Sequence, residues 1–314
     1  MKRNVAFILT AIIFYGNVYL TDCIAQQTQN HNPINGNVLF GRHDPAKYMP
    51  PAKYGHGGAG SVEYMELTPR EKFTSQFLFV HRGILNAKSG LGEHVHRWME
   101  EMYFVMDDNT ARFTVNGRTA ELPGPCMVLC PMGSSHGIYN HNDNPIQFMN
   151  LAVTLKERKY DAKDFAKQND LVDTEIESPP PFLWSVINKK LCQPVENFMG
   201  GKGTVYYRRI WGNDGFKTNW LFVNHYVVPP GSTIGYHRHD HIEEIYYILS
   251  GTGRMTIDGE TLDVKEDDAG SCLLHGAHGF WNNSNGDVEM LSIAAAMEKG
   301  YINHVELDLE MKGR

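Results

Sequence analysis

The sequence predicts an all-β protein made of two β-barrels in tandem, joined by a short helical linker. Three observations lead to this prediction: an internal repeat, short strand-like segments separated by turn dipeptides, and the same histidine and glutamate pattern in both copies. The chain has 314 residues, of which 42% are hydrophobic and 21% charged, a composition typical of folded domains. This length accommodates two domains of ordinary size.

The repeat is visible by direct comparison of the two halves. The strings FLFV at 77–80 and WLFV at 220–223 lie 143 positions apart, and later segments such as RFTVNG at 112–117 and RMTIDG at 254–259 match at an offset of 142. The residues paired by these offsets include His94 with His237, His96 with His239, Glu101 with Glu244 and His136 with His278. A matched series of this length predicts two copies of one structural unit.

Each unit has the pattern of a β-barrel or sandwich. Short runs rich in β-branched and aromatic residues occupy 102–106 and 245–249, and the segments after them alternate apolar with polar residues. Asn116-Gly117 and Asp258-Gly259 are dipeptides preferred in tight hairpin turns, because both central residues need a positive φ. Many short strands separated by such turns predict a closed all-β architecture.

The segments outside the two units differ from them in composition. Residues 156–178 are charged, with loosely helical spacing of apolar residues, and Pro179-Pro180-Pro181 would end a helix there. The arm before the first unit is rich in Gly, Pro and Asn, and we expect it to wrap the first barrel or a partner subunit. The predicted parts are a signal peptide 1–25, an N-terminal arm 26–72, a first barrel 73–155, a helical linker 156–203, a second barrel 204–298 and a C-terminal tail 299–314.

The N-terminus has the features of an export signal. Lys2 and Arg3 precede an apolar stretch over 5–14, and the small-residue site Cys23-Ile24-Ala25 follows. The stretch is shorter than the roughly 20 residues that span a bilayer. We therefore predict a periplasmic or secreted protein without a transmembrane segment in the mature chain. A lipid-anchored form modified at Cys23 is the alternative.

The remaining cysteines are Cys126, Cys130, Cys192 and Cys272. Cys126 and Cys130 share one extended apolar run, and a strand rises about 3.3 Å per residue, so their α-carbons lie farther apart than a disulfide allows. We expect free, buried thiols.

The histidines and the glutamate suggest a metal site in each unit. His94 and His96 are two positions apart, so on a strand both project from the same face. Glu101 can return to that face after a turn, and the turn-rich segment before His136 leads the third histidine into the next strand. Three imidazoles and a carboxylate suit a divalent transition metal, Fe(II), Mn(II), Ni(II), Cu(II) or Zn(II), with coordination positions left open.

These motifs resemble the two signatures of the cupin superfamily, G-x5-H-x-H-x3–4-E-x6-G and G-x5-P-x-G-x2-H-x3-N. The first signature is complete in the second unit, from Gly231 to Gly251, whereas Lys88 and Asp108 replace its flanking glycines in the first unit. The resemblance covers 73–153 and 204–297 and implies two jelly-roll barrels. It implies the metal ligands His94, His96, Glu101 and His136 in one barrel and His237, His239, Glu244 and His278 in the other.

Two positions of the signatures have more than one candidate. Glu100 and Glu243 also satisfy the looser glutamate spacing, but six residues separate Glu244 from the closing glycine, which favours Glu244 and, through the repeat, Glu101. In the second unit His275 lies near His278, and only His278 keeps the spacing to the following asparagine.

Other residues near the motifs have open roles. Arg82 and His225 occupy equivalent positions, where they could bind an acidic group of a substrate or lie on a solvated face. Trp98, Tyr139 and Trp281 could line a pocket or belong to the core or rim.

The resemblance implies several activities. Bicupins with a full ligand set include quercetinase-type dioxygenases and oxalate decarboxylases, and we favour a dioxygenase using Fe(II) or Mn(II), up to one ion per barrel, on a hydroxylated or enolic small molecule. Glu101 and Glu244 would be ligands that also shuttle a proton. The alternatives are a non-oxidative decarboxylase, lyase or sugar isomerase, and a non-catalytic sugar- or metal-binding protein of the envelope.

The net charge and the resemblance to cupins also indicate which binding partners to expect. The net charge of −7 gives no electrostatic case for binding nucleic acid or an anionic membrane. Barrel faces of bicupins often pack against each other, so a homo-oligomer is possible.

Overall fold

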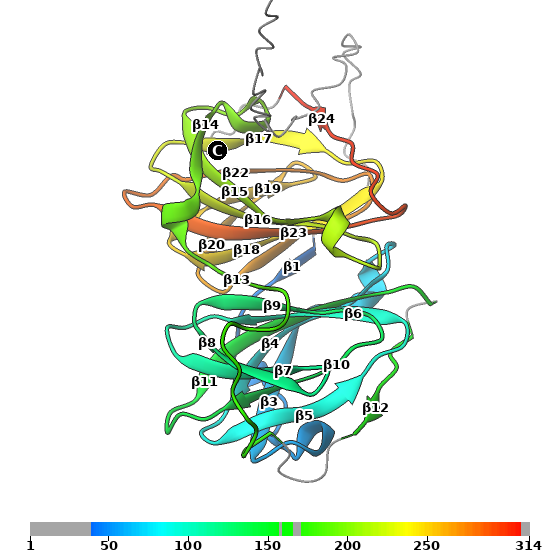
Figure 1. The fold of residues 1–314 in the computed structure, drawn as a ribbon. Helices are drawn as coiled ribbons and strands as arrows, with labels where there is room; N and C mark the ends of the chain where they lie inside the picture. The colour runs from blue at the N-terminus through cyan, green and yellow to red at the C-terminus, as the bar shows by residue number, and fades with distance from the viewer. Residues whose placement is uncertain (1–38, 157–158, 166–170, 309–314) are drawn as a thin grey trace, which may run out of the picture. The chain divides into compact units, whose positions relative to one another are not determined.

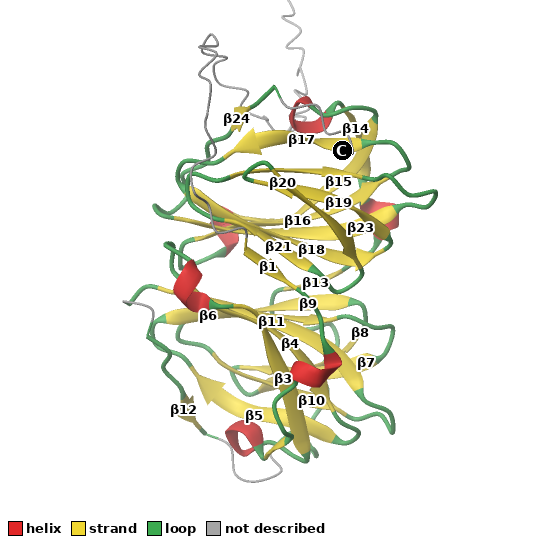
Figure 2. Cartoon of the chain, turned by 180° about the vertical axis from the view of Figure 1, so that it is seen from behind, coloured by secondary structure: helices red, strands yellow, loops and turns green. Residues whose placement is uncertain are grey.

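The fold is all-β, as the sequence predicts. The computed structural model describes residues 39–156, 159–165 and 171–308, and within them the helical segments are three-residue 3-10 turns (Figure 2). Both barrels belong to one compact unit of the chain. The predicted signal peptide and Cys23 lie outside the described residues. None of the helices in the described part is long and apolar enough to cross a membrane.

Barrel 1 consists of two facing antiparallel sheets. Its larger sheet has the order β13-β9-β6-β11-β4-β3-β2, and its smaller sheet has the order β12-β5-β10-β7-β8. The strands are β2 (Ala52–Lys53), β3 (Ser61–Thr68), β4 (Phe77–Leu85), β5 (Ser89–Val95), β6 (Met99–Val105), β7 (Thr110–Val115), β8 (Arg118–Pro123), β9 (Cys126–Cys130), β10 (Ser135–Asn140), β11 (Ile146–Thr154), β12 (Lys163–Asp164) and β13 (Trp184–Val186). They run from blue to green in Figure 1.

Barrel 2 repeats this arrangement. Its sheets have the orders β1-β21-β18-β23-β16-β15-β14 and β20-β19-β22-β17-β24. The strands are β1 (Leu39–Gly41), β14 (Gln193–Glu196), β15 (Thr204–Gly212), β16 (Trp220–Val228), β17 (Thr233–Arg238), β18 (Ile242–Ser250), β19 (Thr252–Ile257), β20 (Glu260–Lys265), β21 (Ala269–Cys272), β22 (Ala277–Trp281), β23 (Val288–Ala296) and β24 (Val305–Glu306). Two jelly-roll barrels are therefore present, as the resemblance implies.

The two barrels exchange edge strands. β1, which precedes barrel 1 in the chain, pairs with β21 of barrel 2, while β13, which precedes most of barrel 2, pairs with β9 of barrel 1. β2 and β3 pair with each other and extend the large sheet of barrel 1 from β4. The arm, which we expected to wrap the first barrel or a partner subunit, contributes strands to both barrels.

The helix predicted at the start of the linker was wrong. In its described part the segment forms β12, whose Lys163 and Asp164 pair with β5, and the Phe165 amide donates to the Glu93 carbonyl. Further on, the Glu177 amide donates to the Thr119 carbonyl. These tertiary backbone bonds satisfy the segment's amides, and they outweigh a helix propensity that is only a few tenths of a kcal/mol per residue.

Side chains along the two central strands alternate between the inside of each barrel and a core shared by both. In β6, Tyr103 and Val105 belong to the interior cluster of barrel 1, whereas Met102 and Phe104 belong to a cluster that also contains Trp220 of barrel 2. β18 has the same alternation. Period-two alternation thus makes these strands apolar on both faces.

Arg82 and His225 neither face the metal clusters nor lie in solvent, so both interpretations of these residues were wrong. The Arg82 guanidinium is buried between the barrels, where Nε lies 3.3 Å from Asp267 Oδ1 and Nη1 donates to the Phe148 carbonyl at 3.0 Å. His225 is buried and lies 2.8 Å from Glu289 through Nε2. Their side chains alternate to the outer face of the sheet, which sequence spacing alone did not reveal.

The prediction of free, buried thiols is confirmed. Cys126, Cys130, Cys192 and Cys272 are all unpaired and buried. Burial raises the pKa of the Cys126 thiol to about 12, so this thiol is protonated and unreactive at neutral pH.

The buried Arg82–Asp267 pair yields a stability prediction. Arg82→Met removes the cation but leaves Asp267 in a partly buried position, and we expect a loss of about 3 kcal/mol in the free energy of unfolding. Urea denaturation followed by fluorescence measures it. Arg118→Met, which removes an exposed pair with Glu177, is the control and should leave the unfolding midpoint unchanged. Equal effects of the two variants would contradict the prediction that the inter-barrel pair stabilises the fold more than an exposed pair does.

Candidate metal centres

The first candidate centre lies between the two sheets of barrel 1. His94 on β5 pairs in register with His136 on β10 in the small sheet, His96 follows the end of β5, and Glu101 reaches in from β6 of the large sheet. The candidate ligand atoms of these four residues all lie within 4.8 Å of one another, and all four side chains are buried. His136 Nε2 is 2.8 Å and His96 Nε2 is 3.3 Å from Glu101 Oε2.

The second centre is built the same way in barrel 2. His237 on β17 pairs with His278 on β22, and His239 Nε2 lies 2.9 Å from Oε2 of Glu244 on β18. These residues and their ligand atoms also fall within 4.8 Å of one another and are buried. The structure therefore brings together all eight residues that the sequence analysis singled out as ligands.

Backbone carbonyls fix the orientation of two histidines in each cluster. Nδ1 of His94 donates to the Gly92 carbonyl at 2.9 Å, and Nδ1 of His96 donates to the Asp161 carbonyl. In barrel 2, His237 donates to Gly235 at 2.9 Å and His239 donates to Asn303 at 2.7 Å. With the proton on Nδ1, the Nε2 lone pair of each ring is available toward the cluster, which is the arrangement found around protein-bound metals.

Both glutamates are held in the ionised form. Burial raises the pKa of Glu101, but the hydrogen bond from His136 and the nearby His96 ring outweigh it and hold that pKa well below its usual range. Its other oxygen accepts a hydrogen bond from Asn150 Nδ2 at 2.7 Å. At the equivalent position in barrel 2, Ser292 donates to Glu244. Each carboxylate thus has one oxygen fixed by a polar neighbour and one directed at the histidines.

The clusters fit a divalent transition metal. Burial, reinforced by His136 and His56, lowers the pKa of His94 to about 2, so this ring is neutral, as a metal ligand must be. Nε2 of both His96 and His239 has no hydrogen-bond partner among the described residues, although both atoms are buried. Three imidazoles and one carboxylate in this arrangement suit Fe(II), Mn(II) or their neighbours in the series.

The structure resolves the two ambiguous positions of the motifs. Glu100 and Glu243 point away from the clusters toward the other barrel, because they alternate with Glu101 and Glu244 along the strands. His275 lies in an exposed turn with φ +64°, and its Nδ1 is 3.8 Å from Asp240. It is not part of the second cluster.

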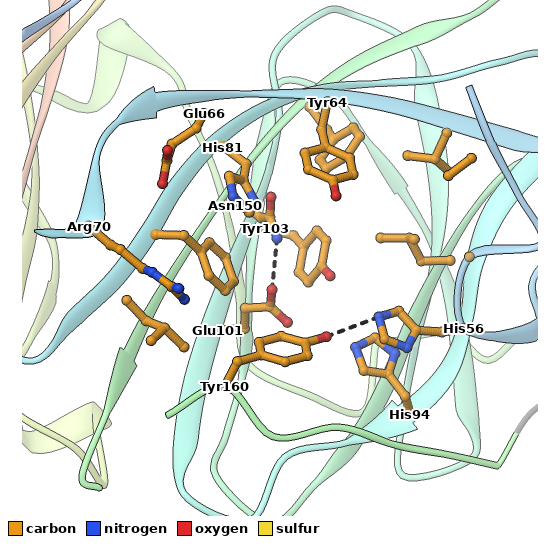
Figure 3. A pocket seen from close by; sticks show the side chains of 17 residues that line it. His56, Tyr64, Glu66, Arg70, His81, His94, Glu101, Tyr103, Asn150 and Tyr160 are labelled. Atoms are coloured by element: carbon orange, nitrogen blue, oxygen red, sulfur yellow. Dashed lines mark hydrogen bonds between the residues drawn. The ribbon is translucent and has the colours of Figure 1, made fainter. Parts of the chain in front are cut away.

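A cavity of about 440 Å³ opens beside the first centre (Figure 3). Glu101 and His94 belong to its wall, and aromatic rings from several strands form much of the rest. The cavity-lining residues are Ala52, Gly55, His56, Val62, Tyr64, Glu66, Arg70, Leu78, Phe79, His81, Leu91, His94, Glu101, Tyr103, Phe148, Asn150 and Tyr160. Its volume falls within the range of small-molecule sites.

None of the three aromatic residues considered for a pocket lines this cavity. Trp98 is 44% exposed and packs against Lys156, Tyr139 is buried against Ala59 and Leu171, and Trp281 lies under Arg254. The interpretation that these three residues line a pocket was therefore wrong, because they belong to the rim or to the core.

Sequence analysis missed a polar group at the cavity wall. His56 stacks on His94 with 3.8 Å between ring centroids, and it hydrogen-bonds Asp164 at 2.7 Å and the Tyr160 hydroxyl at 3.2 Å. A signal was present, because GGAG at 57–60 matches GGKG at 200–203 at the repeat offset and places His56 on Met199. These residues were assigned to the arm and not to the repeat.

The surroundings of the second centre differ. Strand pairing makes Tyr226 of β16 the counterpart of Gly83 of β4, so barrel 2 has a buried ring where barrel 1 has no side chain. A Cβ at Gly83 would lie 2.2 Å from the Phe148 ring. The Tyr226 hydroxyl accepts from Asn224, whose Oδ1 also accepts from Tyr207 and Arg209 at 3.2 Å each. Polar side chains inside barrel 2 therefore bond to one another.

Fold and clusters together define a bicupin with two metal-type centres, and the comparisons agree. Residues 224–294 match the cupin domain family model. The oxalate-binding protein of Thermotoga maritima is 30% identical over 99 residues, which are 32% of this chain and 82% of that protein. The chain belongs to the cupin superfamily.

Solved bicupins share the architecture. The oxalate decarboxylase of Bacillus subtilis superposes with a TM-score of 0.59 at 16% identity, covering 88% of this chain and 81% of that one. Salicylate 1,2-dioxygenase from Pseudoaminobacter salicylatoxidans gives 0.56 at 13% identity, with 74% and 73% covered. At these identities the likeness concerns the fold.

The clusters predict the metal content of the protein. We expect about two equivalents of divalent transition metal per chain by elemental mass spectrometry, and about one in His96→Ala or His239→Ala, because each substitution removes one ligand of one cluster. His275→Ala is the matched control, since this histidine lies outside the cluster, and it should keep both equivalents. Loss of metal from the His275 variant, or none from the other two, would contradict the assignment.

Proposed function

We propose that this protein is a metal-dependent oxidoreductase of the quercetinase-like kind, acting on a hydroxylated or enolic small molecule in barrel 1. The observation that carries the proposal is the aromatic-lined cavity of about 440 Å³ next to Glu101 and His94. Such a cavity is larger than a two-carbon acid requires, and it suits a planar ring. The metal, Fe(II) or Mn(II) by our proposal, would lower the pKa of the substrate hydroxyl and supply the redox chemistry with dioxygen.

The side chains of barrel 1 would orient and enclose the substrate. Tyr64, Phe79 and Phe148 offer ring faces and edges for offset or edge-to-face packing against a planar molecule. With a substrate bound, the cavity wall would shield the reacting face from bulk water and so strengthen local electrostatic interactions. Glu101 would be a ligand that also accepts the substrate hydroxyl proton, with its Oε1 held by the Asn150 amide.

Barrel 2 would bind metal without taking the same substrate. Tyr226 fills the position of Gly83, Met199 replaces His56, and Ile302 stands where Tyr160 lies in barrel 1. The exchanges at His56 and Tyr160 remove polar groups from the wall. We propose that the second centre is structural or regulatory, although its Glu244 has the same ligand geometry.

Oxygen consumption tests the proposal. The protein reconstituted with Fe(II) or Mn(II) should consume dioxygen with at least one member of a panel of flavonols and catechols. His96→Ala should reduce this rate to background, whereas His239→Ala should retain it, because the proposed substrate cavity lies in barrel 1. No consumption with any metal and substrate, or loss of activity only in His239→Ala, would contradict the proposal.

A non-oxidative activity is the second candidate. Glu66 and Arg70 line the same cavity and could hold a carboxylate and carry a proton. The Thermotoga maritima relative is an oxalate-binding protein, and Mn(II) centres are described for the Bacillus subtilis decarboxylase. Release of carbon dioxide from small carboxylic acids under strict exclusion of oxygen would favour this candidate. Tight binding without product would favour a binding protein.

We also propose export of the protein, on the basis of residues 1–25. The substrate would then come from outside the cytoplasm. Cell fractionation with an antibody against the mature chain tests this, and recovery of an uncleaved protein from the cytosol would contradict it.

A further inference from the structure

Each candidate metal glutamate is preceded by a second buried glutamate that reaches the opposite barrel. Glu100 of barrel 1 is fully buried, and its carboxylate accepts the backbone amides of Lys217 and Thr218 at 2.7–2.9 Å. The Thr218 hydroxyl donates to the same carboxylate at 2.7 Å. All of these donors belong to the loop that leads into β16 of barrel 2.

Barrel 2 returns the same contact. Glu243, also fully buried, accepts the backbone amides of Thr74 and Ser75 at 2.8 Å each. Thr74 and Ser75 are the counterparts of Lys217 and Thr218 at the 143-residue offset. The two contacts are therefore one feature of the repeat, formed twice in opposite directions.

The turns that lead to the third histidines are also contacted, by the loop in barrel 1 and by the outward glutamate itself in barrel 2. Lys217 Nζ donates to the Met132 carbonyl at 3.1 Å, in the turn before His136. In barrel 2 the Leu274 amide donates to Glu243 at 3.4 Å, in the turn before His278. Each outward glutamate with its loop thus touches two chain segments that bear ligands of a single cluster.

We propose that Glu100 and Glu243 are positioning residues, through which each barrel sets the metal affinity of the other. Adjacent residues on a strand project to opposite faces, so fixing the Glu100 carboxylate in the other barrel fixes the backbone from which Glu101 projects inward. Loss of the loop contact would leave a buried carboxylate with fewer donors and let the strand shift. Partners that orient metal ligands from outside the first shell are typically worth about 10–100-fold in metal affinity.

The inference is tested with full-length protein reduced to one centre. His239→Ala with His278→Ala leaves only centre 1, and His96→Ala with His136→Ala leaves only centre 2. Zn(II) affinity is then measured in each background by competition with a chromogenic chelator. Thr218→Val, which lies in barrel 2, should weaken Zn(II) binding about 10-fold at centre 1 and leave centre 2 unchanged. Thr218→Ser, which keeps the hydroxyl, should restore the affinity of centre 1.

The matched control lies in the same barrel as Thr218. Thr256→Val removes a buried hydroxyl that is paired with Thr261 at 2.8 Å within barrel 2, so it reproduces a general loss of stability without touching the loop. It should leave the affinity of centre 1 unchanged. Equal weakening of centre 1 by Thr256→Val, weakening of both centres by Thr218→Val, or no effect of Thr218→Val would overturn the inference.

The effect of barrel 1 on centre 2 is tested with Glu243→Gln. This variant should weaken Zn(II) binding at centre 2 and not at centre 1, because the amide donors to Glu243 come from barrel 1. If Thr218→Val does not fold, as judged by near-ultraviolet circular dichroism, Glu243→Gln in the two backgrounds decides. An unchanged affinity at centre 2 would then overturn the inference.

Discussion

The alternation of side chains along β6 and β18 determines both how the two barrels pack and which glutamates reach the metal clusters. On each strand one glutamate faces the histidines inside the barrel, and the preceding glutamate faces the other barrel. The apolar residues that follow divide in the same way between a barrel interior and the shared core. A one-residue slip of either strand would place the wrong carboxylate in the cluster and also disrupt the barrel contact, so the fold and the centres specify each other.

The repeat preserved the ligands while the surroundings diverged. Both clusters have the same donor set, the same backbone acceptors for two histidines, and a polar neighbour on the glutamate. The difference lies in the residues that surround the clusters, where Gly83 and His56 of barrel 1 correspond to Tyr226 and Met199 of barrel 2. These differences around the clusters, together with the cavity beside the first centre, assign the substrate to barrel 1 in our proposal.

Much of the fold and of the two clusters could be predicted from the sequence, because ligand spacing and strand alternation are local properties. The all-β architecture and the grouping of eight ligand residues followed from the repeat. The failures concern contacts between distant segments: Arg82 was placed near substrate or solvent because its partner Asp267 belongs to the other barrel. The helix predicted over the linker was wrong because β12 forms its backbone hydrogen bonds with β5. The cavity wall was missed because His56 and Tyr160 come from segments outside the signature motifs.

We propose that both centres hold metal and that barrel 1 alone admits a small molecule. Anomalous X-ray diffraction from crystals of the Mn(II)-loaded protein, soaked with 4-bromocatechol, tests both parts of this proposal in one experiment. We expect a manganese peak within each cluster and a bromine peak in the cavity of barrel 1 alone. A bromine peak inside barrel 2, or the absence of manganese from either cluster, would contradict it.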